Sequence, residues 1–300
     1  MTATNEQTRG MKAKTIKAIL SKKFTSFVAS IEDEEVRNLV RKNTIITGGC
    51  IASMLLGEKI NDFDLYFTDK QTCVKAAEYY VKKFTAKTGW PMKVEDIDGR
   101  IRIVTESGHR GETAADVATL DDSGAIEDAY EDLNEAAFNT ESEGEPEFRP
   151  VFISTNAITL SDKIQIVLRF YGDADTIHEN YDFVHCTNYW TSREGALTLR
   201  QPALEALLSK ELKYVGSKYP VCSVIRLRKF IRRDWTINAG QILKMMMQIS
   251  ELDLTDPKVL EDQLTGVDSA YFLEIMTKVR ENDPDKVNAS YLVEIIDRMF

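Results

Sequence analysis

Two short stretches decide the fold of this 300-residue chain: Thr47-Gly48-Gly49-Cys50-Ile51-Ala52-Ser53 and Asn61-Asp62-Phe63-Asp64-Leu65-Tyr66. The first stretch follows a β-prone run at 44–47, and the apolar residues behind its glycines suit a helix that ends at Gly57. The second stretch alternates in polarity over residues 62–67, as a strand does. The sequence therefore predicts the order strand, glycine turn, helix, strand.

The two glycines make room for an anion at the turn. Because they lack a Cβ atom, Gly48 and Gly49 let backbone N–H groups approach a ligand closely. The N-terminus of the following helix carries a partial positive charge, which favours a phosphate group there. The pattern predicts a phosphate-binding turn directly after the first strand.

The paired carboxylates on the next strand predict a metal site. Asp62 and Asp64 are two residues apart, and alternate side chains of a strand lie on the same face. Two like charges held together are costly unless a cation neutralises them. Mg²⁺ accepts such oxygens and shares its coordination shell with water and substrate phosphates. We therefore expect two Mg²⁺ ions, with Mn²⁺ as an alternative, and two-metal phosphoryl transfer.

Taken together, these residues resemble a known family. The glycine pair, the Leu55-Leu56-Gly57-Glu58-Lys59 element and the Asp62-x-Asp64 strand are similar to the head of DNA polymerase β-type nucleotidyltransferases. The pattern is nearest to that of the CCA-adding and poly(A) polymerases. The resemblance implies an α+β fold, in which a nucleotidyltransferase domain with a mixed β-sheet is followed by an all-helical domain.

The resemblance also assigns a triphosphate site. Gly48, Gly49 and Ser53 would hold the triphosphate of an NTP such as ATP, with Lys59 beside them. The CCA-adding signature has Arg-Asp where this chain has Ala52 and Ser53. The missing arginine separates the chain from that particular activity.

A third carboxylate is usual in the family, on a later strand. The candidate is Asp182, because Tyr181 to Thr187 is predicted as a strand behind a helix at 173–180. Asp173 and Asp175 are its rivals. The resemblance implies that the third carboxylate completes the metal site on the acceptor side.

A basic segment spans residues 200–234, where nine Lys or Arg stand against three acids, a local charge of +6. Pro220 can open a helix there. Two interpretations stay open: a solvated basic face above a buried apolar one, or contact with triphosphate or a nucleic-acid backbone. The resemblance favours the second, with Lys218 as a further nucleotide contact. Arg226, Lys229 and Arg233 form the basic stripe, and Val224, Leu227 and Ile231 the apolar one.

The net charge of −10 is unevenly distributed. Residues 111–148 contain 13 Asp or Glu and no Lys or Arg, so the rest of the chain sums to +3. We interpret this segment as an acidic insertion at the sheet edge, partly disordered, and as a docking surface for a protein partner. The predicted domains are a disordered tail at 1–11, a catalytic domain at 12–200 and a helical domain at 201–300, where Met245-Met246-Met247 is expected to fill the core.

Composition excludes several other classes of protein. Four cysteines lie far apart without a CxxC pair, which argues against a disulfide framework or a structural zinc site. No apolar run has the roughly 18 residues of a membrane span, and the N-terminus lacks a secretory signal. We expect a cytoplasmic protein, in the host cytoplasm if a phage encodes it, and the compact chain with its acidic block favours a phage source.

The sequence thus predicts a metal-dependent nucleotidyltransferase. The expected acceptor is an RNA 3′ end. The alternatives are a protein-modifying nucleotidyltransferase or toxin, and a protein of this fold that binds nucleotide or a partner without turnover.

Overall fold

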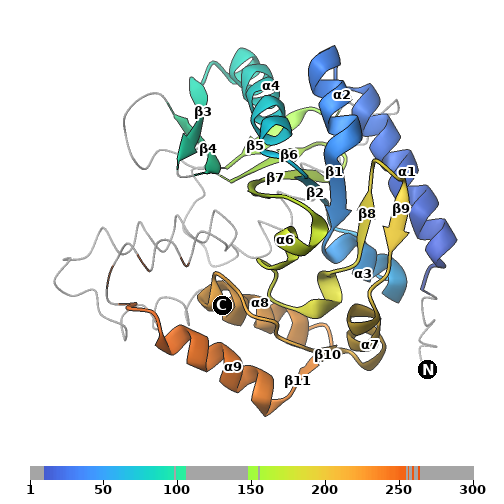
Figure 1. Ribbon diagram of the computed structural model, residues 1–300, viewed down its shortest axis with the longest axis vertical. Coiled ribbons are helices and arrows are strands. Elements are labelled where there is room, and N and C mark those ends of the chain that lie inside the picture. The colour runs from blue at the N-terminus through green and yellow to red at the C-terminus, as the bar shows by residue number, and fades with distance from the viewer. Residues whose placement is uncertain are drawn as a thin grey trace, which may run out of the picture. The chain divides into compact units, whose positions relative to one another are not determined.

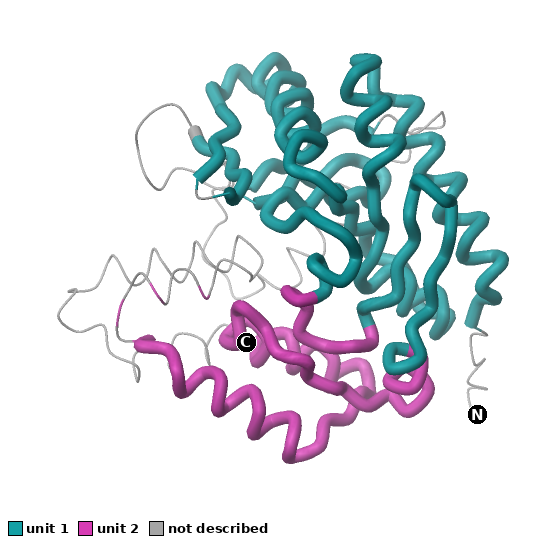
Figure 2. The backbone as a smooth tube through the Cα atoms, viewed as in Figure 1, with its two compact units in different colours: residues 1–178, 186–203 teal, residues 179–185, 204–300 magenta. Residues whose placement is uncertain are grey.

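The computed structural model describes residues 10–97, 99–105, 148–154 and 156–254, together with residues 256, 259 and 263. It divides into two compact units, shown in Figure 2: unit 1 comprises residues 1–178 and 186–203, and unit 2 comprises 179–185 and 204–300. The predicted tail, apart from residues 10 and 11, and the acidic insertion, apart from Phe148, lie outside the described residues.

Unit 1 combines helices with a mixed sheet (Figure 1). Its helices are α1 (Ala13–Ala29), α2 (Glu34–Asn43), α3 (Gly49–Leu56), α4 (Lys70–Thr88) and α6 (Ala174–His178). Its sheet strands are β1 (Thr44–Thr47), β2 (Phe63–Phe67), β5 (Pro150–Ile153), β6 (Ala157–Leu160), β7 (Ile164–Tyr171), β8 (Tyr189–Thr191) and β9 (Ala196–Thr198). A separate hairpin consists of β3 (Met92–Ile97) and β4 (Arg100–Thr105).

The seven strands are ordered β5-β6-β7-β2-β1-β8-β9. Strands β2 and β7 are parallel, and every other pair in this sheet is antiparallel. The α+β class with a mixed sheet is therefore confirmed. The strand at 44–47 and the helix that ends at Gly57 are also confirmed. Strand β2 begins at Phe63, so Asp62 lies immediately before it.

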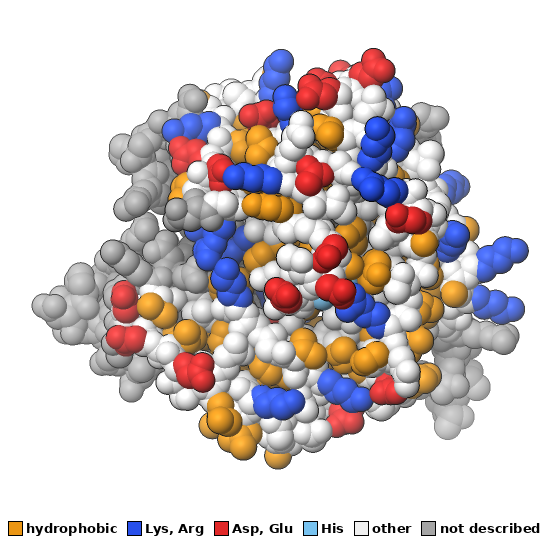
Figure 3. Space-filling view, viewed as in Figure 1, with side chains coloured by type: hydrophobic (Ala, Val, Ile, Leu, Met, Phe, Trp, Pro, Cys, Tyr) orange, Lys and Arg blue, Asp and Glu red, His pale blue; other side chains and the backbone are white. Residues whose placement is uncertain are grey.

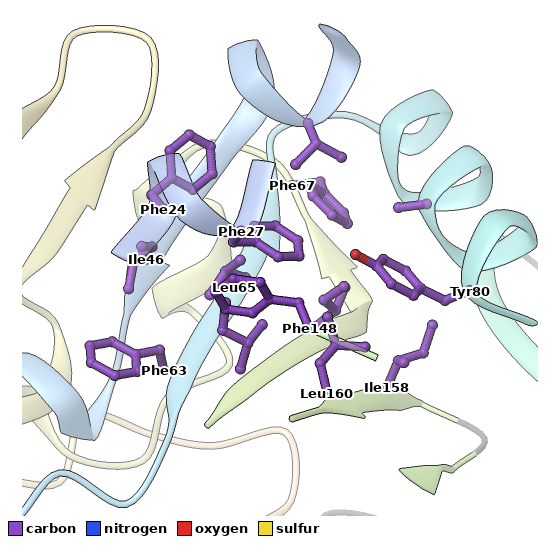
Figure 4. Close-up of a cluster of buried hydrophobic side chains, with 14 of the residues drawn as sticks. Phe24, Phe27, Ile46, Phe63, Leu65, Phe67, Tyr80, Phe148, Ile158 and Leu160 are labelled. Atoms are coloured by element: carbon purple, nitrogen blue, oxygen red, sulfur yellow. The ribbon is translucent and has the colours of Figure 1, made fainter. Parts of the chain in front are cut away.

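The core of unit 1 lies between one face of the sheet and helices α1 and α4 (Figure 4). Alternate residues of β2, namely Phe63, Leu65 and Phe67, point into this core and are almost fully buried. Phe27 of α1 and Tyr80 of α4 pack against the same cluster. Because strand side chains alternate, Asp64 projects from the opposite face of the sheet.

Local signals set the ends of the longest helix of unit 1. The Asp69 side chain accepts a hydrogen bond from the backbone N–H of Thr72 (2.8 Å), which caps the start of α4. Gly89 ends the helix in the left-handed conformation, with φ of +76°. Capping and termination are thus supplied by residues adjacent to the helix.

After residue 150, one expectation is wrong and one element was not predicted. Residues 181–187 do not form a strand: Val184–Cys186 is a short 3₁₀ helix, η2, and Phe183 makes only an isolated bridge to Tyr214. The hairpin β8–β9 was not foreseen, although β8 pairs with β1. That pairing joins residues far apart in the chain, which local patterns do not report.

Unit 2 is mainly helical, with α7 (Gln201–Ser209) from Leu204 onward, α8 (Pro220–Ile231) and α9 (Ala239–Ser250). Unlike the predicted all-helical region, it also contains a parallel pair of two-residue strands, β10 (Glu211–Leu212) and β11 (Thr236–Ile237). The Met run is only partly core, since Met245 is buried whereas Met246 and Met247 are 60% and 61% exposed. Within the described part of the chain, no helix is long and apolar enough to cross a membrane.

An aromatic cluster stabilises unit 2 around the buried His185. The His185 ring lies 4.3 Å from Trp235 and 4.7 Å from Phe230, measured between ring centroids. Phe183 packs edge-on against Phe230 at 5.5 Å. Burial, and then the charge of Arg233, lower the pKa of His185 to about 3. The imidazole is therefore neutral in the folded protein at neutral pH.

We expect this histidine to make unit 2 sensitive to acid. An unfolded histidine has a pKa near 6.5, above the folded value of about 3. The unfolded state binds the proton first as pH falls, so the stabilisation present above pH 6.5 is lost progressively towards pH 3. Between pH 7 and pH 5 the loss is about 2 kcal/mol. Denaturant unfolding across this range measures it.

His185→Phe keeps an aromatic ring in the cluster and removes the titration. The variant should lose about 2 kcal/mol less than the wild-type protein between pH 7 and pH 5. An identical acid dependence in both proteins contradicts the assignment.

Candidate functional site

The turn after β1 has the backbone that the glycine pair predicts. Gly48 has φ of +92° and ψ of −153°, a conformation that is strained for any residue with a side chain. Its N–H donates to the Cys186 carbonyl oxygen (3.2 Å), which ties the turn to the segment before β8. A Cβ atom at Gly49 would meet nothing within 4 Å. Gly48 is thus required by its backbone, whereas Gly49 borders open space.

Helix α3 begins at Gly49, and no side chain caps its N-terminus. The amide groups of a first helical turn have no partner within the helix. Together with the helix dipole they favour an anion. The structure thus gives the turn the local geometry of an anion site.

The two aspartates lie beside this turn. In the sheet Asp64 is paired with Thr47, the residue directly before Gly48. Burial raises the pKa of the Cys50 thiol well above its usual value, and the negative charges of Asp64 and then Asp62 raise it further. Cys50 lies in the first turn of α3, so both carboxylates act on the start of that helix. Both aspartates are partly exposed.

A polar residue of β7 joins this arrangement and was missed from the sequence. Gln165 is paired with Asp64 across the β2–β7 ladder. Paired positions on neighbouring strands share a face of the sheet. The available signal was one polar residue in the apolar run Ile164–Val167. These residues belong to a row of paired positions that crosses all seven strands: Phe152, Thr159, Gln165, Asp64, Thr47, Tyr189 and Thr198.

The other predicted triphosphate contacts lie further along the same segment. Ser53 is the fifth residue of α3 and is buried, and its carbonyl oxygen accepts from the Glu58 N–H (2.8 Å). Lys59 is exposed, two residues beyond Gly57. Ser53 therefore lies past the first helical turn, and the nucleotide-binding roles of both residues stay predictions.

Asp182 belongs to unit 2, where it forms an ion pair with Arg226 of α8. The Asp182 side chain is 4% exposed and that of Arg226 is 41% exposed. The sequence assigns these two residues to different ligands, a metal and a phosphate, whereas the structure joins them to each other. Their roles toward those ligands stay predictions.

The two rival carboxylates also have structural partners. Asp173 accepts from the backbone N–H of Thr176 (2.8 Å) at the start of α6, and this hydrogen bond lowers its pKa. Asp175 pairs with Arg200. Throughout the described ranges, no group of three or more His, Cys, Asp or Glu side chains is arranged to hold a metal ion. Carboxylate oxygens such as those of Asp62 and Asp64 are of the type that Mg²⁺ prefers, and the metal site at these two residues stays a prediction.

The basic helix is confirmed, but the predicted burial of its apolar stripe is wrong. Val224 and Ile231 are 45% and 52% exposed. The side of α8 that is buried instead carries Cys222, Ser223 and Ile225. The apolar spacing correctly predicted a helix, but it predicted the wrong side of that helix to be buried. Lys218 and Lys229 are exposed in unit 2, and their contact with nucleotide stays a prediction.

The fold and the site define an α+β protein in which a glycine turn lies beside a paired-carboxylate strand. Residues 18–210 match the family described as "Gabija anti-defense 2 family protein". The chain therefore belongs to the Gabija anti-defense 2 family.

A curated relative from Bacillus phage SPbetaL7, named "Gabija anti-defense 2", is 22% identical over 263 residues. The match covers 85% of this chain and 49% of the relative, so the chain spans about half the length of that protein.

Solved structures similar to this chain include the Thermotoga maritima CCA-adding enzyme complexed with tRNA, with a TM-score of 0.40 at 14% identity. That match covers 86% of this chain and 53% of the enzyme. A tRNA-processing enzyme with CTP has a TM-score of 0.38 at 13% identity, covering 89% and 57% respectively.

Proposed function

We propose that this protein is a metal-dependent nucleotidyltransferase that acts against the Gabija defence in the host cytoplasm. The observation that carries the proposal is the pairing of Asp64 with Thr47, which places Asp64 beside the residue that precedes Gly48. The turn would hold the triphosphate of an NTP by backbone amides. Asp62 and Asp64 would hold Mg²⁺, which when bound supplies charge stabilisation at the phosphates and a more acidic acceptor hydroxyl.

The chain's own contribution to the reaction is orientation. The Gly48 backbone conformation, which glycine tolerates, sets the start of α3, and β2 holds Asp64 on the neighbouring strand. Groups held in position before the substrate arrives need no reorganisation during transfer. The acceptor hydroxyl oxygen would attack the α-phosphorus and release its proton to water, and pyrophosphate would leave with the electron pair of the broken P–O bond.

The acceptor we propose first is an RNA 3′ end. The second is a hydroxyl group on a protein component of the Gabija defence. The family name supports an action on that defence, and neither acceptor requires a change in the site described above. The two differ in which macromolecule must bind the surface around the turn.

A second candidate function is a binding protein without turnover. Among the residues that the structure describes, eight of the nine large hydrophobic side chains that are exposed belong to unit 2, and Figure 3 shows such side chains at its surface. Leu243, Met246 and Met247 of α9 are 56–61% exposed. Exposed apolar patches of this kind mark interaction surfaces, and Met-rich ones adapt to partners. This surface would suit a stoichiometric inhibitor.

Incubation with each α-labelled NTP and Mg²⁺ separates the candidates. Pooled RNA serves as acceptor in one set of reactions and purified Gabija components in another, and EDTA provides the metal-free control. Label on RNA supports the first acceptor, and label on protein supports the second. Complex formation without any labelled product supports the binding protein and contradicts the transferase.

A further inference from the structure

A buried hydrogen-bond centre lies directly before the Gly48 turn. The Thr47 side chain is fully buried, and its hydroxyl oxygen lies 2.8 Å from His178 Nε2 and 2.9 Å from the Asn188 carbonyl oxygen. The Cys186 carbonyl oxygen is more distant, at 3.4 Å. All these residues belong to unit 1. Thr47 thus joins α6 and the segment before β8 to the end of β1.

Donor and acceptor chemistry assigns the proton on His178. A hydroxyl has one proton to donate, and a carbonyl oxygen can only accept. The Thr47 hydroxyl therefore donates to Asn188, its nearer carbonyl partner, and accepts from His178. A bond accepted from His178 requires a proton on Nε2. The contact fixes one tautomer of the neutral ring.

The surroundings keep the ring neutral and in place. His178 is 6% exposed, and its ring packs against Tyr189 with 5.8 Å between centroids. Burial, and then the charge of Arg200, lower the pKa of His178 to about 4, with Asp175 acting in the opposite direction. Arg200 also packs against Tyr189, because its guanidinium lies 5.3 Å from the centroid of the Tyr189 ring.

The same arginine ties the segment to α6. Its side chain pairs with Asp175, and its backbone N–H donates to the Asn188 side-chain oxygen (2.8 Å). Asn188 therefore receives one hydrogen bond on its backbone carbonyl and another on its side chain. Asn188, which accepts from the Thr47 hydroxyl, is therefore held by Arg200 in the same region of unit 1 as His178.

We propose that His178 is a positioning residue that holds the Gly48 turn in place through the Thr47 hydroxyl. Thr47 precedes Gly48 directly and is paired with Asp64, so a shift of Thr47 moves both the turn and its alignment with the carboxylate strand. The structural part of this inference is independent of catalysis. Its effect on nucleotide binding rests on the proposed function.

The tautomer can be read directly by ¹⁵N NMR of the histidine rings at pH 7. The chain has three histidines, so spectra of His178→Gln and His185→Phe assign the signals. We expect the His178 ring to carry its proton on Nε2 and none on Nδ1. A proton on Nδ1 alone overturns the proposal whatever the protein catalyses.

The holding role is tested by hydrogen exchange at the Gly48 amide, which donates to Cys186. Thr47→Val keeps the branched shape and removes the hydroxyl. We expect this variant to accelerate exchange at the Gly48 amide about tenfold more than exchange at the Leu65 amide of the core strand. Thr47→Ser keeps the hydroxyl and should exchange within about twofold of the wild-type protein. Equal acceleration at Gly48 and Leu65 means general destabilisation and overturns the proposal.

Two further variants complete the test. His178→Leu should accelerate Gly48 exchange as Thr47→Val does, so the prediction survives the failure of either variant to fold. His185→Phe is the matched control, because it removes a second buried histidine of the described residues, in unit 2, and should leave Gly48 unchanged. Where the wild-type protein binds NTP, Thr47→Val should raise KM about tenfold with little change in kcat. Wild-type KM in Thr47→Val contradicts positioning of the turn, whereas failure of the wild-type protein to bind NTP contradicts only the proposed function.

Discussion

Replacing Asp64 with Asn is expected to lower the proposed nucleotidyl transfer about a thousandfold, because the substitution would remove one of the two carboxylates proposed to hold Mg²⁺ beside the phosphates. The fold should survive. Asp64 projects from the face of β2 opposite the core and is partly exposed, and removing one of two neighbouring like charges relieves repulsion. Labelled-NTP turnover measures the first effect, and thermal unfolding without metal measures the second.

Asp62→Asn should behave similarly, since its charge acts on the same helix start as that of Asp64. Glu78→Gln is the matched control, because Glu78 is an exposed carboxylate on α4. Wild-type turnover in Asp64→Asn would end the metal-site assignment, and a marked loss of thermal stability would indicate a structural role. Protection of phage against the Gabija defence should fall in parallel with turnover. Full protection by Asp64→Asn would instead favour the binding protein.

Breaking the Asp182–Arg226 pair is expected to destabilise unit 2 by about 3 kcal/mol, because Arg226→Ala leaves a carboxylate buried without its counter-charge. The Asp182 side chain is almost fully buried, whereas that of Arg226 is partly exposed. The unpaired Asp182 carboxylate would remain largely out of contact with water, and this accounts for most of the lost stability. Urea unfolding followed by the fluorescence of Trp235, which lies in unit 2, reports the loss.

A double-mutant cycle separates the ion pair from the predicted ligand roles. Asp182→Asn combined with Arg226→Gln should be less destabilised than the sum of the two single variants, because neither charge is then left alone. Additive losses contradict a stabilising pair. Loss of nucleotide binding, together with a shallower salt dependence in Arg226→Gln, would support its predicted contact with phosphates. Unchanged binding would confine both residues to a structural role.

Helix α8 shows what helical periodicity in a sequence can predict and what it cannot. The spacing of α8 and its proline start were sufficient to predict a helix. The side that is buried could not be deduced, because Val224 and Ile231 are exposed while Cys222 and Ser223 are buried. Helical spacing reports which residues share a side, and the packing partners decide which side faces the core.

The glycine turn and the carboxylate strand were determined by the sequence itself. Gly48 is the residue type that tolerates its backbone angles, and the burial of the alternate residues Phe63, Leu65 and Phe67 places Asp64 on the face opposite the core. Both properties are local. A handful of neighbouring residues is therefore enough to specify them.

Only the tertiary structure decided what surrounds them. Thr47 meets His178 across 131 positions of sequence, Asp182 meets Arg226 across 44, and Gln165 reaches Asp64 through the parallel pairing of β7 with β2. None of these partners has a spacing that a local pattern could reveal. Gln165 meets Asp64 because burying the apolar face of the sheet against α1 and α4 sets the strand order and register, and the register fixes which polar residues lie side by side. The other two contacts depend on how α6 packs within unit 1 and how α8 packs within unit 2.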